Sequence, residues 1–198
     1  MATKTYLCRD YHKPNKTMKK AYILLADGFE TIEALTPLDV LVRSGIEVRT
    51  LSIGSSYDVR SAQGVTVVVD GLLSATDTTD GAALILPGGY PGYKNLAESA
   101  EVLRVVAEYY NSNRLVAAIC GAPTVLSFAG VAYGKELTAH TSVTGELGED
   151  QVSTDEVVCS GNLITGKGAG LSLPFALAIA EALTSAEKVA EVKEKMEF

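Results

Sequence analysis

The stretch that decides the fold is RLVAAICGAPTVLSF, residues 114–128. Its first half is a short apolar run typical of a strand buried on both faces, and its second half predicts a helix with Pro123 in the first turn. Cys120 stands at the turn between the two. A side chain at such a turn projects from the edge of the sheet, as the serine does in the nucleophile elbow of hydrolases. The stretch therefore predicts a thiol at the end of a buried strand.

Cys120 by itself allows two interpretations. The free N–H groups at the start of the helix would stabilise a thiolate and lower the pKa of the thiol, which favours a reactive cysteine. A buried structural thiol is the commoner state of a lone intracellular cysteine. The segment taken alone favours neither interpretation.

Strands and helices alternate on both sides of this stretch. Apolar runs predict strands at 21–26, 46–53, 65–69 and 82–86, and helical spacing predicts helices at 31–43, 99–110, 173–183 and 184–196. Asp27 with Glu30, and Thr184 with Glu187, have the spacing of capping boxes. Glycines and a Ser-Gly-Asn turn within residues 136–165 predict short strands and a hairpin. The pattern is typical of a doubly wound α/β fold, with a mostly parallel sheet sandwiched by helices.

Three polar or glycine-rich segments each follow a predicted strand. They are Asp27–Glu33, Pro87–Gly89 and Cys120 with Gly121. Ligands of such folds bind at the carboxyl ends of parallel strands, so the three segments are expected to converge there. This convergence favours a functional thiol over a structural one.

Composition sets further limits. The 198 residues suit one domain, and residues 18–198 are expected to form it, preceded by a polar, disordered or non-native extension at 1–17. No apolar run is long enough to span a membrane, and the net charge of −7 argues against nucleic acid as a partner. Cys8, Cys120 and Cys159 make neither a disulfide framework nor a metal-ligand spacing, which predicts a reducing, cytoplasmic setting. Neither Cys8 nor Cys159 receives a role.

Five ordered motifs carry a resemblance to a known family. They are LLADGFETIEAL (24–35), ILPGGYPGYKNLAES (85–99), LVAAICGAPTVL (115–126), LTAH (137–140) and ITGKGAG…PFALAIAEAL (164–183). The chain from about Lys19 onward resembles the DJ-one/ThiJ/PfpI superfamily, in the branch of the parkinsonism-associated protein deglycase and its bacterial relatives. The resemblance implies a flavodoxin-like fold, a homodimer, and no cofactor or metal.

The resemblance also implies roles for individual residues. Cys120 would be the nucleophile, and Glu33 the protonated carboxylic acid beside it. The backbone N–H groups of Gly88, Gly89 and Gly121 would form an oxyanion hole, and His140 would be the histidine of the pocket. Without the family, Glu33 would read as a surface charge, the glycines as a tight turn and His140 as a structural residue.

Two departures from the superfamily limit the activity. The protease-like branch carries His directly after its Cys, whereas this chain has Gly121, and no acidic residue is evident to orient His140. Peptidase activity is therefore discounted. The accessory cysteines of the animal deglycase are absent, with Val68 at one position and the other in the divergent segment 55–63, so regulation through them is not carried over.

The leading functional hypothesis is a cysteine-dependent aldehyde-defence enzyme. It would be a glyoxalase III or protein deglycase, a hydro-lyase or hydrolase that acts on methylglyoxal or on glycated groups through Cys120. The alternative is an oxidative-stress sensor or chaperone in which Cys120 is oxidised to the sulfinate. An amidotransferase-like or thiazole-biosynthesis enzyme is a weaker alternative. The physiological substrate stays open, because both leading hypotheses use the same residues.

Overall fold

A seven-stranded sheet forms the centre of the molecule. The structure, a computed structural model, describes residues 20–147 and 152–198. Within them the strand order is β5-β2-β1-β6-β7-β9-β8, and only β8 runs antiparallel to its neighbour. The strands are β1 (Lys20–Leu25), β2 (Glu47–Ser52), β5 (Gly71–Leu72), β6 (Ala83–Leu86), β7 (Leu115–Ile119), β8 (Val157–Ser160) and β9 (Leu163–Gly166). The mostly parallel sheet confirms the predicted fold class.

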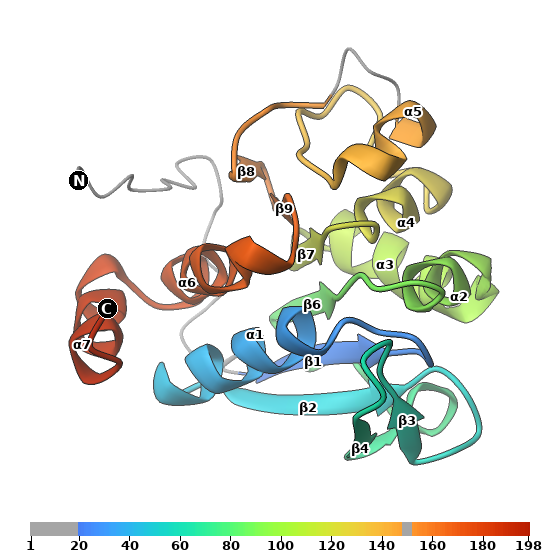
Figure 1. Cartoon of the computed structure of the whole chain (residues 1–198), viewed down its shortest axis with the longest axis horizontal. Helices are drawn as coiled ribbons and strands as arrows, with labels where there is room; N and C mark the ends of the chain where they lie inside the picture. The colour runs from blue at the N-terminus through green and yellow to red at the C-terminus, as the bar shows by residue number, and fades with distance from the viewer. Residues whose placement is uncertain (1–19, 148–151) are drawn as a thin grey trace.

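Helices cover both faces of this sheet (Figure 1). One face carries α1 (Thr31–Arg43), α6 (Ser172–Leu183) and α7 (Ala186–Lys195), with α1 packed beside α6. The other face carries α2 (Gly92–Glu98), α3 (Ala100–Asn111) and α4 (Pro123–Phe128). The shorter helices are α5 (Thr144–Leu147), η1 (Leu73–Ala75), η2 (Thr141–Val143) and η4 (Ala169–Leu171). No helix of the described residues is long and apolar enough to cross a membrane.

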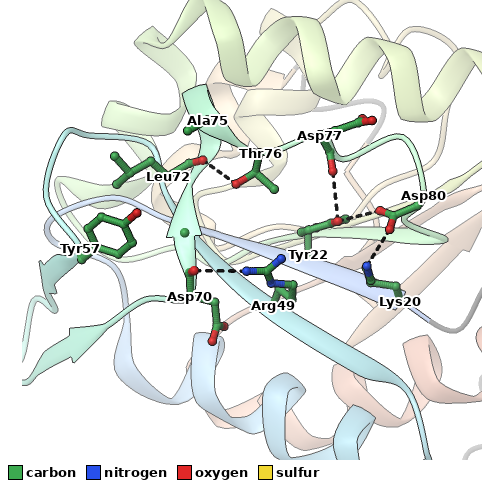
Figure 2. Close-up of a pocket in the computed structure, with 11 residues that line it drawn as sticks. Lys20, Tyr22, Arg49, Tyr57, Asp70, Leu72, Ala75, Thr76, Asp77 and Asp80 are labelled. Carbon is green, nitrogen blue, oxygen red and sulfur yellow. Dashed lines mark hydrogen bonds and ion pairs between the residues drawn. The ribbon is translucent and has the colours of Figure 1, made fainter.

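The amino ends of β1 and β6 border a polar pocket of about 370 Å³ (Figure 2). Lys20 Nζ lies 2.6 Å from Asp80 Oδ2, and the Tyr22 hydroxyl donates to Asp80 Oδ1 at 2.7 Å. Arg49 Nη2 donates to the carbonyl of Asp70 at 3.2 Å. These polar groups bond to one another, and the lining contains no cysteine or histidine. The lining contains none of Glu33, Gly88, Cys120 and His140, so the pocket is separate from the site predicted around Cys120.

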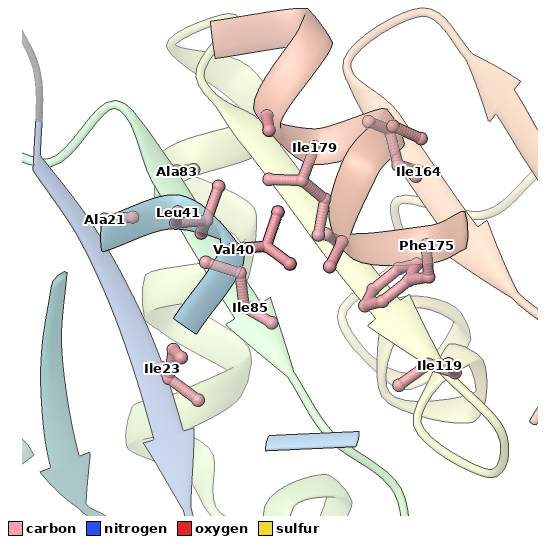
Figure 3. Packing of buried hydrophobic residues seen from close by; sticks show 14 of the residues in the cluster. Ala21, Ile23, Val40, Leu41, Ala83, Ile85, Ile119, Ile164, Phe175 and Ile179 are labelled. Carbon is pink, nitrogen blue, oxygen red and sulfur yellow. The ribbon is translucent and has the colours of Figure 1, made fainter. Parts of the chain in front are cut away.

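The core is built from side chains that alternate along the central strands. In β1, Ala21, Ile23 and Leu25 belong to the cluster under α1 and α6, whereas Tyr22 and Leu24 point to the opposite face. Figure 3 shows the first cluster, in which side chains of α1 and α6 pack over those of four strands. The labelled residues are Ala21, Ile23, Val40, Leu41, Ala83, Ile85, Ile119, Ile164, Phe175 and Ile179. Burial on both faces explains why these strands read as continuous apolar runs.

Two predicted capping boxes are wrong by a few residues. Glu30, not Asp27, is the N-cap of α1, and its side chain accepts the Glu33 N–H at 2.8 Å. Asp27 instead accepts the N–H of Arg60 at 2.8 Å, because the chain must still turn before α1 can begin. Ser185 rather than Thr184 caps α7. Both shifts leave the helices themselves in place.

Two hairpins complete the fold. β8 and β9 pair antiparallel across the turn at Gly161, which confirms the hairpin predicted within 136–165. β3 (Asp58–Arg60) and β4 (Thr66–Val68) form a separate two-stranded sheet. The Gly28 N–H donates to the Arg60 carbonyl at 2.7 Å, so this second hairpin braces the loop that leads into α1. The extension predicted at residues 1–17 lies outside the described residues and stays a prediction.

Candidate active site

Cys120 occupies a left-handed turn between β7 and α4, with a φ of 64°. This region is unfavourable for residues with a β-carbon, so neighbouring structure must impose it. The Cys120 N–H donates to the Gly166 carbonyl at 2.9 Å, and the Cys120 carbonyl accepts the N–H of His140 at 2.9 Å. The turn is therefore held from both sides, and the thiol stays partly exposed.

Glu33 lies beside this thiol rather than in solvent. Its side chain is 0% exposed, and Oε2 accepts the Gly88 N–H at 2.8 Å. Oε1 is buried without a hydrogen-bond partner among the described residues. Cys120 nevertheless lies close enough to act on the carboxyl electrostatically. A protonated Oε1 could donate a hydrogen bond to the sulfur, which would satisfy the unpaired oxygen.

Burial raises the pKa of Glu33 to about 7, and the nearby charge of Glu30 raises it as well. Interaction with Cys120 and the N–H of Gly88 oppose this shift, because both favour the carboxylate. A carboxyl with this pKa exists in both protonation states near neutral pH. Glu33 can therefore give and take a proton under the conditions where general acid–base catalysis is most effective.

The expected lowering of the Cys120 pKa is wrong. Burial raises the pKa of Cys120 to about 12, and the Glu33 carboxylate raises it further. The N–H groups of Gly89 and Gly121 act in the lowering direction but are outweighed. Two adjacent negative charges repel in a buried site, so the thiolate is favoured when Glu33 carries a proton. Near neutral pH the thiol therefore keeps its proton, and the negative charge of the pair lies on Glu33 when that carboxyl is ionised.

The three glycines expected to form an oxyanion hole have different partners. The Gly88 N–H is taken by Glu33, so it is not open to a substrate oxygen. The N–H groups of Gly89 and Gly121 are the two that interact with the Cys120 sulfur. The arrangement therefore leaves Gly89 and Gly121 as candidate oxyanion donors and gives Gly88 the task of holding Glu33.

Gly88 also has no room for a side chain. An added Cβ would lie 2.7 Å from Cys120 Cβ, 2.7 Å from Glu33 Oε2 and 3.0 Å from the Ile119 carbonyl. We expect Gly88→Ala to lower the free energy of unfolding by about 3 kcal/mol, as overpacking of a rigid site does. Thermal or urea unfolding measures it. Gly145→Ala is the control, because its Cβ meets no atom within 4 Å, and equal losses in both variants would contradict the expectation.

His140 is oriented by Ser142, a contact that the sequence did not reveal. Nδ1 of His140 lies 2.8 Å from the Ser142 hydroxyl and accepts the Ser142 N–H at 3.2 Å. A backbone N–H can only donate, so Nδ1 is the acceptor and a neutral ring carries its proton on Nε2. A hydroxyl two residues downstream therefore fixes the ring in place of the acidic partner that the sequence lacks.

The remaining predicted features are also located. Cys159 lies on β8 (Val157–Ser160), and Cys120 is a free cysteine. The described residues hold no group of three or more His, Cys, Asp or Glu side chains able to bind a metal ion. The structure thus brings Glu33, Gly88, Gly89, Cys120 and Gly121 together, with His140 joined to the same turn through its backbone.

Comparisons with known proteins agree on one family. The family model described as DJ-1/PfpI matches residues 19–182. The chain is 38% identical to Protein dj-1beta of Drosophila melanogaster over 176 residues, which is 88% of this chain and 94% of that protein. It is 37% identical to glutathione-independent glyoxalase DJR-1.2 of Caenorhabditis elegans over 174 residues, 86% of this chain and 91% of the relative.

A solved structure supports the same family. Oxidized Toxoplasma gondii DJ-1 superposes with a TM-score of 0.87 at 28% identity and covers 90% of this chain and 98% of its own. The family match includes both Glu33 and Cys120, since it runs from residue 19 to residue 182. The chain is therefore a member of the DJ-1/PfpI family.

Proposed function

We propose that this protein is a stress-defence enzyme that converts small α-oxoaldehydes such as methylglyoxal into hydroxy acids without a cofactor. The observation that carries the proposal is the buried Glu33 carboxyl, with a pKa of about 7, against the free thiol of Cys120. The relative named a glutathione-independent glyoxalase supports the same chemistry. A deglycase would apply the same thiol to aldehyde adducts on proteins.

The first step joins the substrate to Cys120. The Glu33 carboxylate takes the proton of the Cys120 thiol as Sγ adds to the aldehyde carbon, and the electron pair of the C=O bond moves to its oxygen. The N–H groups of Gly89 and Gly121 stabilise the developing negative charge, and Glu33 then returns the same proton to this oxygen, which completes the hemithioacetal. Glu33 is again a carboxylate next to the former aldehyde carbon.

The second step moves hydrogen within the bound substrate. The Glu33 carboxylate removes the proton from the former aldehyde carbon and returns it to the neighbouring carbonyl carbon through an enediolate. A hydroxyl proton passes from the first oxygen to the second, and we assign its relay to Nε2 of His140. Water then cleaves the resulting thioester, which releases lactic acid and restores the thiol. One methylglyoxal and one water give one lactic acid, so no external oxidant is required.

The test is lactate formation from methylglyoxal in the absence of glutathione. We expect many lactate molecules per protein chain, measured enzymatically against time at neutral pH. Protein whose thiol has been alkylated beforehand serves as the control. Consumption of one equivalent of methylglyoxal without lactate would show trapping rather than turnover, and would contradict the enzyme proposal.

A redox sensor is the second candidate, supported by the unpaired Glu33 Oε1 beside a partly exposed thiol. A peroxide would transfer one oxygen to the thiolate to give a sulfenate and water, and a second peroxide would give the sulfinate. Protonated Glu33 would stabilise that group by donating to a sulfinate oxygen. The solved relative titled as oxidized is consistent with such chemistry in that protein.

The wider setting is also part of the proposal. We place the protein in the cytoplasm as a homodimer, with small aldehydes and neither nucleic acid nor membrane as partners. Exposed apolar side chains on α1 and at the β3–β4 hairpin are surfaces that a second copy could cover. They are Ile32, Val42, Val65 and Val68.

A further inference from the structure

Tyr93 fills the space over the residue that follows Cys120. It lies in the first turn of α2, and its ring rests on the backbone of Gly121. A Cβ added to Gly121 would lie 2.6 to 2.8 Å from three ring carbons of Tyr93. The ring therefore occupies the volume that a side chain at position 121 would take, and only glycine is compatible with it.

The same residue contacts three segments around Cys120. The Tyr93 N–H donates to the Gly89 carbonyl at 2.9 Å, and its ring covers Gly121. Tyr93 also packs against the cluster of Ala139, Val143 and Leu147, whose first member directly precedes His140. Tyr93 thus lies between the turn that carries the thiol and the segment that carries the histidine.

The Tyr93 side chain lies within electrostatic reach of Cys120. The ring is only partly buried. Burial raises the pKa of Tyr93, and Cys120 is among the groups that raise it further. The phenol and the thiol therefore lie near enough to interact electrostatically, which agrees with the packing of the ring on Gly121.

We propose that Tyr93 is a specificity-determining residue, a wall that admits small aldehydes with a short apolar substituent to Cys120 and excludes bulky ones. The ring offers an apolar surface to a methyl group and leaves no volume above Gly121 for a larger one. The identity of the substrate rests on the proposed function, whereas the limit on size concerns access to the thiol itself.

The first test measures access without catalysis. Cys120 is alkylated with N-methylmaleimide and with N-(1-pyrenyl)maleimide, and peptide mapping gives both rates. Both reagents carry the same electrophile. The ratio of the alkylation rate with the bulky reagent to that with the small reagent therefore depends on reagent size. We expect Tyr93→Ala to raise this ratio about tenfold, the usual effect of opening a pocket by a few atoms. Tyr93→Phe and Tyr133→Ala, which alters a side chain that is 92% exposed, should leave it unchanged.

An unchanged ratio in folded Tyr93→Ala, or an equal rise in Tyr93→Phe, would overturn the proposal. Thermal unfolding establishes that each variant is folded. If Tyr93→Ala does not fold, Tyr93→Leu takes its place and should give a smaller rise in the same direction.

The second test compares substrates. Tyr93→Ala should raise kcat/KM for phenylglyoxal relative to methylglyoxal by about tenfold, with Tyr93→Phe close to wild type. If the wild type turns over neither aldehyde, the proposed function fails while the maleimide ratio still decides the role of Tyr93. If turnover occurs but Tyr93→Ala leaves the ratio of kcat/KM for phenylglyoxal to kcat/KM for methylglyoxal unchanged, the proposed role of Tyr93 in substrate size is contradicted. The proposed enzymatic function is then retained.

Discussion

Cys120→Ser is expected to lose lactate formation from methylglyoxal by about 10⁴-fold or more, as removal of a catalytic nucleophile does. Serine preserves the shape of the turn and its two backbone hydrogen bonds, to Gly166 and His140. Its hydroxyl ionises far less readily than a thiol, however, and a buried site with a neighbouring carboxyl makes an alkoxide still less accessible. The chemistry should therefore disappear while the fold remains.

The measurement is the initial rate of lactate production by wild type and variant at equal concentrations. Circular dichroism melts of both proteins show whether the substitution has altered the fold. Equal rates would remove Cys120 from the mechanism. A variant that still forms lactate slowly, with its melt unchanged, would indicate a route through bound water instead of a covalent adduct.

Glu33→Gln is expected to lower kcat by about 10²- to 10⁴-fold, the range for loss of a positioned acid–base group. The amide can still accept the Gly88 N–H, so the local packing is retained. It can neither remove the proton from the hemithioacetal carbon nor return it. Glu98→Gln, at an exposed carboxyl on α2, is the control and should keep wild-type kcat. A Glu33→Gln variant with full activity would assign the proton transfer to another group.

The same variant changes how stability depends on pH. The pKa of Glu33 is about 7 in the folded chain against a usual 4.5, so between these values the folded state keeps a proton that the unfolded state has lost. The free energy of unfolding of the wild type should thus fall as pH rises from 4.5 to 7, by about 3 kcal/mol from this group, and then level off. Glu33→Gln should lack this decline in urea titrations. If the free energy of unfolding of Glu33→Gln still falls between pH 4.5 and 7, a group other than Glu33 holds the proton.

Local patterns in the sequence predict most of the sheet. The apolar runs of β1, β6 and β7 are visible because parallel strands are buried on both faces, and Thr31–Arg43 is visible because α1 has helical spacing. The short helix α2 escaped prediction because its first residues, Gly92 and Tyr93, follow Pro91 in a turn-like composition. Strand and helix periodicity therefore accounts for the architecture but not for the segment that closes the site.

The candidate site was only partly accessible from sequence. Cys120 stands out through its strand–helix turn, whereas Glu33 was selected over Glu30 by family resemblance alone. The use of the Gly88 N–H by Glu33 spans 55 residues of chain, and no local rule reports such a contact. The raised pKa of Cys120 has the same origin, since burial and a carboxyl from another helix outweigh the adjacent N–H groups. Ser142 carried a local signal, a hydroxyl two residues after a histidine, but such pairs are common.

The left-handed backbone at Cys120 places stability and chemistry in conflict at one position. Seven other left-handed positions among the described residues are glycine. Glycine would relax the turn at 120 as well, because a β-carbon there is unfavourable by about 1–2 kcal/mol. A search for stabilising substitutions guided by melting temperature alone would thus favour glycine at 120, and the most stable form of this fold would have no thiol.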